Sequence, residues 1–109
     1  MENKNDLAEI KKAITLTLNE EQIDTAGMYL FGSRARGDFS KKSDYDILLV
    51  TRKKIRIKEK IKLFTRLMRV LAKQKYNVDI VIKSEEETTY YKSKIGHIVR
   101  SALNEGILI

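Results

Sequence analysis

Short continuous apolar runs alternate along this chain with longer stretches in which apolar residues recur every three or four positions. Residues 28–31 (Met-Tyr-Leu-Phe) and 47–50 (Ile-Leu-Leu-Val) are bounded by Gly, Ser and Asp, which predicts two buried strands. Residues 77–82 (Asn-Val-Asp-Ile-Val-Ile) predict a third strand. The terminal run at residues 107–109 is a candidate for a last strand or for packing against a partner.

Helical spacing predicts three amphipathic helices, one before the first strand, one between the second and third strands, and one near the end of the chain. Each apolar stripe is expected to face a sheet. The stripes are Leu7, Ile10, Ile14 and Leu18; Ile57, Ile61, Phe64, Leu67, Met68 and Leu71; and Ile95, Ile98, Val99, Ala102 and Leu103. With a short helical turn after the first strand, this order predicts an α/β (α+β) fold in which helices pack on a small mixed β-sheet.

The length and composition predict one domain spanning residues 1–109, because 109 residues with 42% hydrophobic content can build a single modest core. The absence of cysteine excludes disulfides and thiolate metal sites. No apolar stretch approaches membrane-spanning length, and the first residues do not resemble a signal peptide. We therefore expect a cytoplasmic protein without membrane contact.

Positive charge is concentrated in residues 52–75. This segment holds eleven basic residues against Glu59 alone, so it carries +10 while the whole chain carries +7 and the remainder −3. One interpretation is a solvated helix face. The other is a docking surface for an acidic protein or for RNA, since attraction to phosphates does not depend on sequence.

The chemistry-bearing residues lie between the first two predicted strands. Gly32 allows the backbone to approach a ligand closely, and Ser33 offers a hydroxyl and an N–H at the start of a helical turn, where phosphate is favoured. Arg34 and Arg36 add positive charge beside them. Ordinary turn chemistry is the alternative interpretation, because Gly, Ser and Asp are common in loops.

Three aspartates are candidate metal ligands. Asp44 and Asp46 open the second predicted strand, and side chains two residues apart project to the same face of a strand. Asp79 lies within an apolar strand, where a carboxylate is costly to bury unless it is paired or bound to a cation. Three carboxylates on two neighbouring strands predict a site for two divalent ions, for which Mg²⁺ is suited. An ion pair with a nearby Lys or Arg is the alternative for Asp79.

The string Gly32-Ser33-Arg34-Ala35-Arg36-Gly37 followed by Ser43-Asp44-Tyr45-Asp46 resembles the DNA polymerase β-type nucleotidyltransferase superfamily in its minimal stand-alone (MNT) branch. The resemblance implies a polymerase β-like fold over nearly the whole chain, with two Mg²⁺ ions and ATP. It also implies that Ser33 contacts the nucleotide phosphates, that Asp44 and Asp46 bind both ions, and that Asp79 helps to bind one ion and activates the attacking hydroxyl.

The same resemblance implies a partner. Many minimal members are similar to the antitoxin half of toxin–antitoxin pairs and transfer AMP from ATP to a tyrosine of a HEPN-domain toxin. We therefore expect an adenylyltransferase that acts on such a toxin. Two alternatives remain: the same chemistry on a small molecule or an RNA 3′ end, and an antitoxin that neutralises by binding alone. His97 is expected to be structural or surface-exposed, and Asp38 is expected to be a turn or cap residue.

Overall fold

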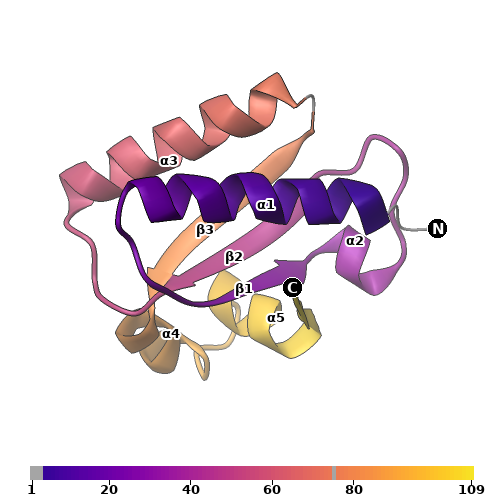
Figure 1. Ribbon diagram of the computed structural model, residues 1–109. Helices are drawn as coiled ribbons and strands as arrows, with labels where there is room; N and C mark the ends of the chain where they lie inside the picture. Colours follow the sequence, from indigo (N-terminus) through magenta and orange to yellow (C-terminus); the bar gives the residue numbers. More distant parts are fainter. Residues whose placement is uncertain (1–3, 75) are drawn as a thin grey trace.

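Four strands form one mixed sheet at the centre of the molecule (Figure 1). The computed structural model describes residues 4–74 and 76–109, so residues 1–3 of the predicted domain and Lys75 of the predicted basic segment lie outside the described residues. The strands are β1 (Thr25–Phe31), β2 (Tyr45–Thr51), β3 (Val78–Ser84) and β4 (Ile107–Leu108), in the order β3-β2-β1-β4. β2 is parallel to β3, whereas β1 is antiparallel to β2 and β4. The predicted mixed sheet and the candidate last strand are confirmed.

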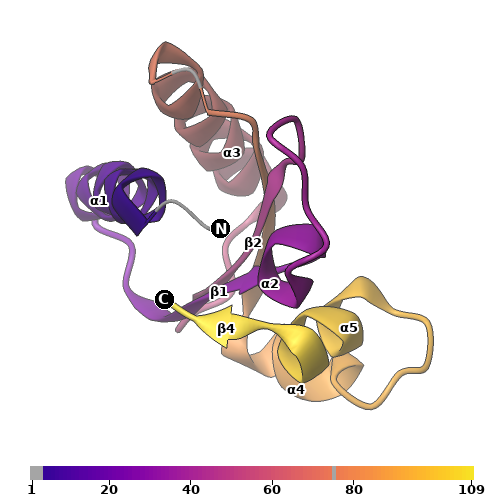
Figure 2. The ribbon, with the colours of Figure 1, turned by 90° about the vertical axis from the view of Figure 1, so that its right-hand side faces the viewer.

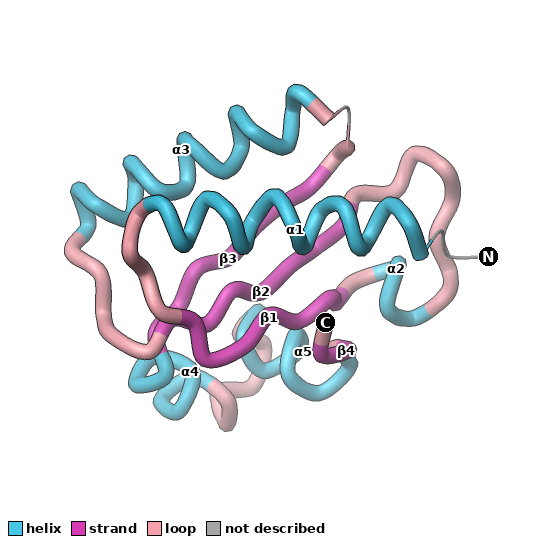
Figure 3. The backbone as a smooth tube through the Cα atoms, viewed as in Figure 1, coloured by secondary structure: helices cyan, strands magenta, loops and turns pink. Residues whose placement is uncertain are grey.

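Helices cover the two faces of this sheet. α1 (Lys4–Glu20) and α3 (Ile57–Lys73) lie on one face, and α4 (Glu85–Tyr91) and α5 (Ile98–Glu105) lie on the other (Figure 2). The short helix α2 (Ser33–Arg36) follows β1 directly, and the loop from α2 back to β2 lies at the same end of the sheet (Figure 3). The α/β class is therefore confirmed. No helix in the described part of the chain has the length and apolar character needed to cross a membrane.

The run Ile47–Val50 of strand β2 is continuously apolar because it is covered on both faces. Ile47 and Leu49 belong to the larger hydrophobic cluster beneath α1 and α3, whereas Leu48 and Val50 belong to a smaller cluster that includes Ala102 of α5. All four side chains of this run are buried, as expected for a central strand between two helical layers. The alternation also fixes the face of the polar residues nearby, because residues two apart share a face.

The apolar stripe predicted for α3 is only partly correct. Leu67 is buried as expected, together with Leu63, which the predicted stripe omitted. In contrast, Ile57 and Ile61 are 69% and 60% exposed, and Phe64 is 38% exposed. The prediction that these three face the sheet is wrong because α3 packs beside β3, the last strand of the sheet, and its outer row extends past that strand.

The last helical region differs from the prediction at its start. Ile95 lies outside α5 and is 89% exposed, because Gly96 adopts a positive φ of 82° and His97 caps the helix. The His97 Nδ1 accepts a hydrogen bond from the Val99 N–H at 3.1 Å, and its ring stacks on Tyr91. His97 is thus structural, as predicted.

Helix α4 was not predicted. Its N-terminus is fixed by a capping box, in which the Ser84 hydroxyl accepts from the Glu87 N–H and the Glu87 carboxylate accepts from the Ser84 N–H. Glu85, Glu86 and Glu87 occupy its first turn, where negative charge stabilises a helix. None of its residues is buried, so the apolar periodicity that reveals the longer helices is missing.

Candidate active site

The chain makes a sharp turn between β1 and α2. Gly32 has φ 73° and ψ −158°, a combination that is essentially restricted to glycine. Ser33 begins α2, and the helix ends after one turn at Gly37, which is left-handed with φ 87°. The predicted helical turn at Ser33 is therefore confirmed, and the glycines on each side of it are required by the backbone.

Asp46 and Asp79 lie directly beside one another. They are paired Cα positions on the adjacent parallel strands β2 and β3, and paired side chains project to the same face. That face is the one covered by α5, because Leu48 and Val81, two residues further along each strand, belong to the cluster on that side. The fold thus brings together two carboxylates that are 33 residues apart in the sequence.

The position of Asp44 and the exposure of Asp79 differ from the prediction. Asp44 precedes β2, which begins at Tyr45, so it lies in the approach loop and does not open the strand. Asp79 is exposed on β3, the edge strand of the sheet. The prediction that Asp79 is buried is therefore wrong. An exposed carboxylate at this position does not need an ion pair to offset the cost of burial.

Gly32 and Asp46 are in very close contact. A Cβ atom built on Gly32 would lie 2.2 Å from Oδ2 and 3.1 Å from Cγ of Asp46. Any other residue at position 32 would displace the Asp46 carboxylate or the turn itself. The glycine therefore allows the backbone at the end of β1 to lie directly against a carboxylate, which places the Gly32-Ser33 turn next to the acidic pair.

Asp46 has other acidic side chains near it. Partial burial raises the pKa of the Asp46 carboxyl, and the neighbouring Asp79 and Asp44 raise it further, while Arg36 opposes the shift and Glu105 adds to it. A carboxylate that is partly desolvated among other acids gains more from a nearby cation than an exposed one does. A cation bound beside Asp46 would therefore favour its ionised form.

The donor set fits Mg²⁺, which prefers carboxylate oxygens. Among the described residues, no three acidic, histidine or cysteine side chains stand close enough together to hold a metal ion as they are arranged. Because Asp46 and Asp79 are paired on adjacent strands, rotation about their side-chain bonds can direct both carboxylates to one ion. Asp44, Asp46 and Asp79 are the residues that would hold it.

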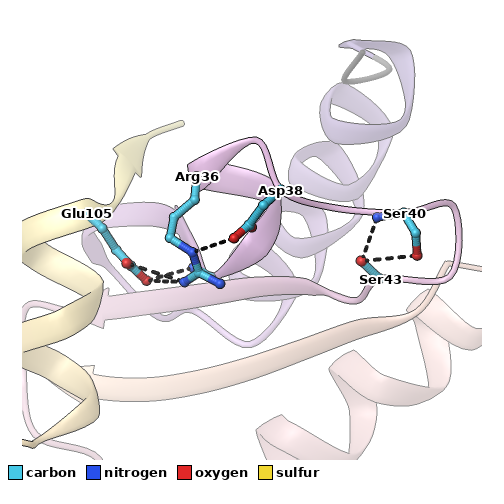
Figure 4. Close-up of polar contacts among 6 residues, drawn as sticks. Arg36, Asp38, Ser40, Ser43 and Glu105 are labelled. Atoms are coloured by element: carbon cyan, nitrogen blue, oxygen red, sulfur yellow. Dashed lines mark hydrogen bonds and ion pairs between the residues drawn. The ribbon is translucent and has the colours of Figure 1, made fainter.

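A fourth carboxylate, Glu105, was missed by the sequence analysis. It lies at the end of α5, 73 residues after Gly32, and its Oε1 accepts the Gly32 N–H at 3.2 Å. Arg36 Nη1 donates to both Glu105 oxygens, at 3.2 and 3.4 Å, and Arg36 Nε donates to Asp38 at 3.3 Å (Figure 4). Glu105 therefore connects α5 to both ends of the short helix α2. No local motif marks it, and only the topology reveals it.

The two arginines have different surroundings. Hydrogen bonds and charge from Asp38, followed by those from Glu105, raise the pKa of Arg36, so it stays protonated. Arg34 donates from Nε and Nη2 to the Ser43 carbonyl at 3.3 and 3.1 Å. Its guanidinium also lies over two aromatic rings, at 4.6 Å from the centroid of Phe39 and 4.2 Å from that of Tyr45.

These contacts indicate that Arg34 fixes the loop that leads to Asp44. Ser43, whose carbonyl it binds, immediately precedes Asp44. The loop is further closed by the Ser40 N–H, which donates to Ser43 Oγ at 2.9 Å (Figure 4). A planar guanidinium that is stacked and doubly hydrogen-bonded is well ordered. Arg34 thus holds the loop before Asp44, whereas Arg36 binds Glu105, the acceptor of the Gly32 N–H.

Comparison with known proteins identifies the family. A family model described as "Polymerase beta, Nucleotidyltransferase" matches residues 4–109. No curated protein is significantly similar in sequence. Among solved structures, a protein from Sulfolobus solfataricus, provisionally assigned as a nucleotidyltransferase, shares 24% identity at a TM-score of 0.55, with 98% of this chain and 87% of that chain covered.

Two further solved structures are toxin–antitoxin complexes. One contains AMP-PNP and gives 20% identity at a TM-score of 0.55, and the other is a mutant of the pair MntA–HpeT and gives 16% identity at a TM-score of 0.53. In both cases the match covers 89% of this chain and 69% of that chain. At these identities the similarity shows a common fold. Because the family match spans nearly the whole chain and the fold agrees, the chain belongs to the polymerase β nucleotidyltransferase family and is a nucleotidyltransferase.

Proposed function

We propose that this nucleotidyltransferase uses Mg²⁺ and ATP to transfer AMP to a hydroxyl, most simply a tyrosine, of a HEPN-domain toxin, and so acts as an antitoxin. The observation that carries the proposal is the pairing of Asp46 with Asp79 on adjacent strands beside the Gly32-Ser33 turn. The similarity to toxin–antitoxin structures, one of them with AMP-PNP, supports the donor and the kind of partner.

Each acidic residue has a distinct part in the proposal. Asp44, Asp46 and Asp79 would hold two Mg²⁺ ions, which when bound neutralise the triphosphate charge and position the α-phosphate. Asp46 has the most restricted position, because it is half-buried and lies against Gly32. Asp79 is exposed on the edge strand β3. An accessible carboxylate suits the group that receives a proton from an incoming acceptor.

The nucleotide-binding side is formed by Gly32, Ser33, Arg34 and Arg36. Ser33 offers its hydroxyl to the β and γ phosphates at the start of α2. Arg36 supplies a permanent positive charge beside Asp46, and Arg34 acts by fixing the loop before Asp44. Catalysis would come from positioning and charge neutralisation, because no residue here needs to form a covalent intermediate.

The transfer itself is a single displacement at phosphorus. The hydroxyl oxygen of the acceptor forms a bond to the α-phosphorus of ATP, and the bond from that phosphorus to the oxygen bridging to the β-phosphate breaks. Pyrophosphate leaves with the bridging oxygen, and the hydroxyl proton passes to Asp79. The acceptor gains AMP through a phosphodiester bond.

The test is label transfer to the co-purified toxin partner. The complex is incubated with Mg²⁺ and ATP labelled either at the α- or at the γ-phosphate, and GTP, CTP and UTP are compared. The proposal predicts label on the partner from α-labelled ATP and none from γ-labelled ATP, with the mass increase of AMP on a tyrosine. The matched control is Asp24→Asn, because Asp24 is exposed and lies before β1, at the opposite end of that strand from Gly32.

The alternatives give different outcomes in the same assay. Label on RNA or on a small molecule, with none on the partner, would leave the family chemistry intact and refute the toxin as acceptor. Neutralisation of the toxin by Asp44→Asn and Asp46→Asn variants would show that binding alone suffices. Label from γ-labelled ATP would indicate phosphoryl transfer and contradict the proposal.

A further inference from the structure

An apolar groove runs between α3 and β3, away from the Gly32-Ser33 turn. It has a volume of about 380 Å³ and is lined on the helix side by Ile57, Ile61 and Phe64. These three side chains are exposed at successive turns of α3, the same three that the sequence predicted to be core. Large apolar side chains that gather at one exposed place are typical of a binding surface.

The strand side of this groove is an open sheet edge. β3 is the outermost strand, and the groove is lined by Ile80, Val81, Ile82 and Lys83 in succession. Because successive side chains point to opposite faces, a groove lined by all four must follow the backbone edge of the strand. An edge strand offers a row of N–H and C=O groups that another strand can pair with.

The orientation of the backbone groups of β3 supports pairing with an added strand. The Asn77 carbonyl accepts the Tyr45 N–H of β2, so the groups of every second residue after it also point toward β2. The N–H and C=O groups of Ile80 and Ile82 then point outward, into the groove. A segment that pairs with them would satisfy these groups and cover the exposed side chains of α3 at the same time.

The rim of the groove is positively charged. Lys60 and Lys83 line it, and Lys54 is close enough to interact with Lys60. Burial lowers the pKa of Lys60; Glu87 opposes the shift, and Lys83 and Lys54 add to it. Glu87 interacts with Lys60 and Lys83, so the two lysines that line the groove exceed this carboxylate in charge and the rim attracts negative charge.

We propose that the groove between α3 and β3 binds an extended acidic segment of a partner protein, which pairs with β3 as an added strand. Apolar side chains of the segment would cover Ile61 and Phe64, and its carboxylates would pair with Lys60 and Lys83. Strand addition of this kind gives affinity through the backbone and specificity through side-chain pockets. The proposal does not depend on catalysis. It predicts a partner strand that runs next to Asp79, since Asp79 immediately precedes Ile80 on β3.

Two other occupants fit the groove less well. A second copy of the chain would bring two basic rims together, and like charges oppose such a contact. RNA would find lysines, but bases stack on aromatic side chains, and Phe64 is the one aromatic residue among the described residues that line the groove. Ile57 and Ile61 would stay uncovered. An acidic, partly apolar protein segment satisfies the charge, the apolar floor and the open strand edge together.

The test uses a displayed library of random short peptides selected on the full-length protein. The expected peptides alternate apolar residues with Asp or Glu, and in amide NMR spectra they shift the signals of Ile80, Ile82 and the α3 residues.

Ile61→Asp should weaken binding about tenfold or more, because it places a carboxylate on the apolar floor. Ile95→Asp is the matched control, since Ile95 is an exposed isoleucine outside the groove. Lys60→Glu should weaken binding, whereas Lys11→Glu, at an exposed position of α1, should not.

Every other outcome overturns the proposal. Failure to enrich any peptide, enrichment of basic peptides, or equal binding by Ile61→Asp and the parent protein would each do so. A dimer seen by sedimentation and broken by Ile61→Asp would assign the groove to a second copy. Binding of single-stranded RNA that is lost with Lys60→Glu and kept with Ile61→Asp would assign the basic rim to RNA. Loss of binding accompanied by a changed circular dichroism spectrum is resolved with Phe64→Ser, which must weaken binding while keeping the fold.

Discussion

Gly32 has no side chain to separate it from Asp46, and a Cβ atom at position 32 would lie 2.2 Å from the Asp46 Oδ2. The contact connects the end of β1 to the first acidic residue of β2, whose Cα position is paired with that of Phe31. It explains why a glycine and an aspartate that are separated by a loop form one structural unit. The chemistry proposed for the site depends on this close approach of the Gly32 backbone to Asp46.

Substitution Gly32→Ala should abolish activity and lower stability. The positive φ alone costs about 1–2 kcal/mol, and the clash displaces the Asp46 carboxylate. The matched control is Gly96→Ala, which has a similar φ of 82° but nothing within 4 Å of the added Cβ. Both variants should lose stability in urea, Gly32→Ala at least as much as Gly96→Ala, and only Gly32→Ala should lose label transfer. Full activity of Gly32→Ala would show that the close approach is not needed.

Substitution Asp46→Asn should stabilise the metal-free protein at neutral pH while removing activity. The raised pKa of Asp46 means that its ionised form is less favourable in the folded chain than in the unfolded chain. The folded state then binds more protons, so stability falls as the pH rises from the ordinary carboxyl range through the raised pKa, and the penalty is complete above it.

The measurement is the melting temperature in EDTA between acidic and neutral pH. The parent protein should lose stability over this range relative to Asp46→Asn, and the two curves should converge at low pH, where the carboxyl is protonated. Mg²⁺ with ATP should raise the melting temperature of the parent and leave Asp46→Asn unchanged. A lower melting temperature for Asp46→Asn at neutral pH would contradict this account.

Glu105 should act as a positioning residue for the Gly32-Ser33 turn. Glu105→Ala removes the acceptor of the Gly32 N–H and one partner of Arg36, so the KM for ATP should rise about tenfold, equivalent to about 1.4 kcal/mol. Glu105→Gln retains an oxygen acceptor and should restore most of the activity. Asn104→Ala, an exposed neighbour on α5, should behave as the parent. A fall in kcat at constant KM would indicate a direct role in chemistry.

The capping box of α4 should contribute measurable stability. The Ser84 side chain is buried and accepts the Glu87 N–H at 3.1 Å, so Ser84→Ala should cost about 1 kcal/mol. Ser93→Ala, at an exposed serine, should change stability by less than about 0.5 kcal/mol. Urea denaturation followed by circular dichroism makes the comparison. Equal stability of the two variants would mean that α4 does not depend on its cap.

The strands and long helices could be predicted because burial imposes a pattern on the residues that experience it. The run Ile47–Val50 is continuously apolar since β2 is covered on both faces, and α1 has a clear stripe. Helix α4 has no buried residue, so its only signal was the Ser84 and Glu87 capping pair. The outer row of α3 was misassigned because periodicity cannot show where a sheet ends.

The site was predictable to the extent that its residues lie in one segment or on a recognisable strand. Gly32, Ser33, Asp44 and Asp46 form a local motif, and Asp79 stands out within an apolar strand. The register that pairs Asp46 with Asp79, and the exposure of Asp79, depend on strand order and could not be read from the sequence. Glu105 is an ordinary helical glutamate until α5 packs beside β1.

The central claim is that Asp46 and Asp79 form a metal-nucleotide site beside the Gly32-Ser33 turn. Amide NMR with Mn²⁺ and a non-hydrolysable ATP analogue tests it directly, because the paramagnetic ion broadens signals near its binding site. The account predicts that broadening centres on Asp46, Asp79 and Ser33, and that it disappears in Asp46→Asn but persists in the control Asp24→Asn. Broadening centred on another group of carboxylates, such as Asp6 and Glu9, or unchanged broadening in Asp46→Asn, would contradict it.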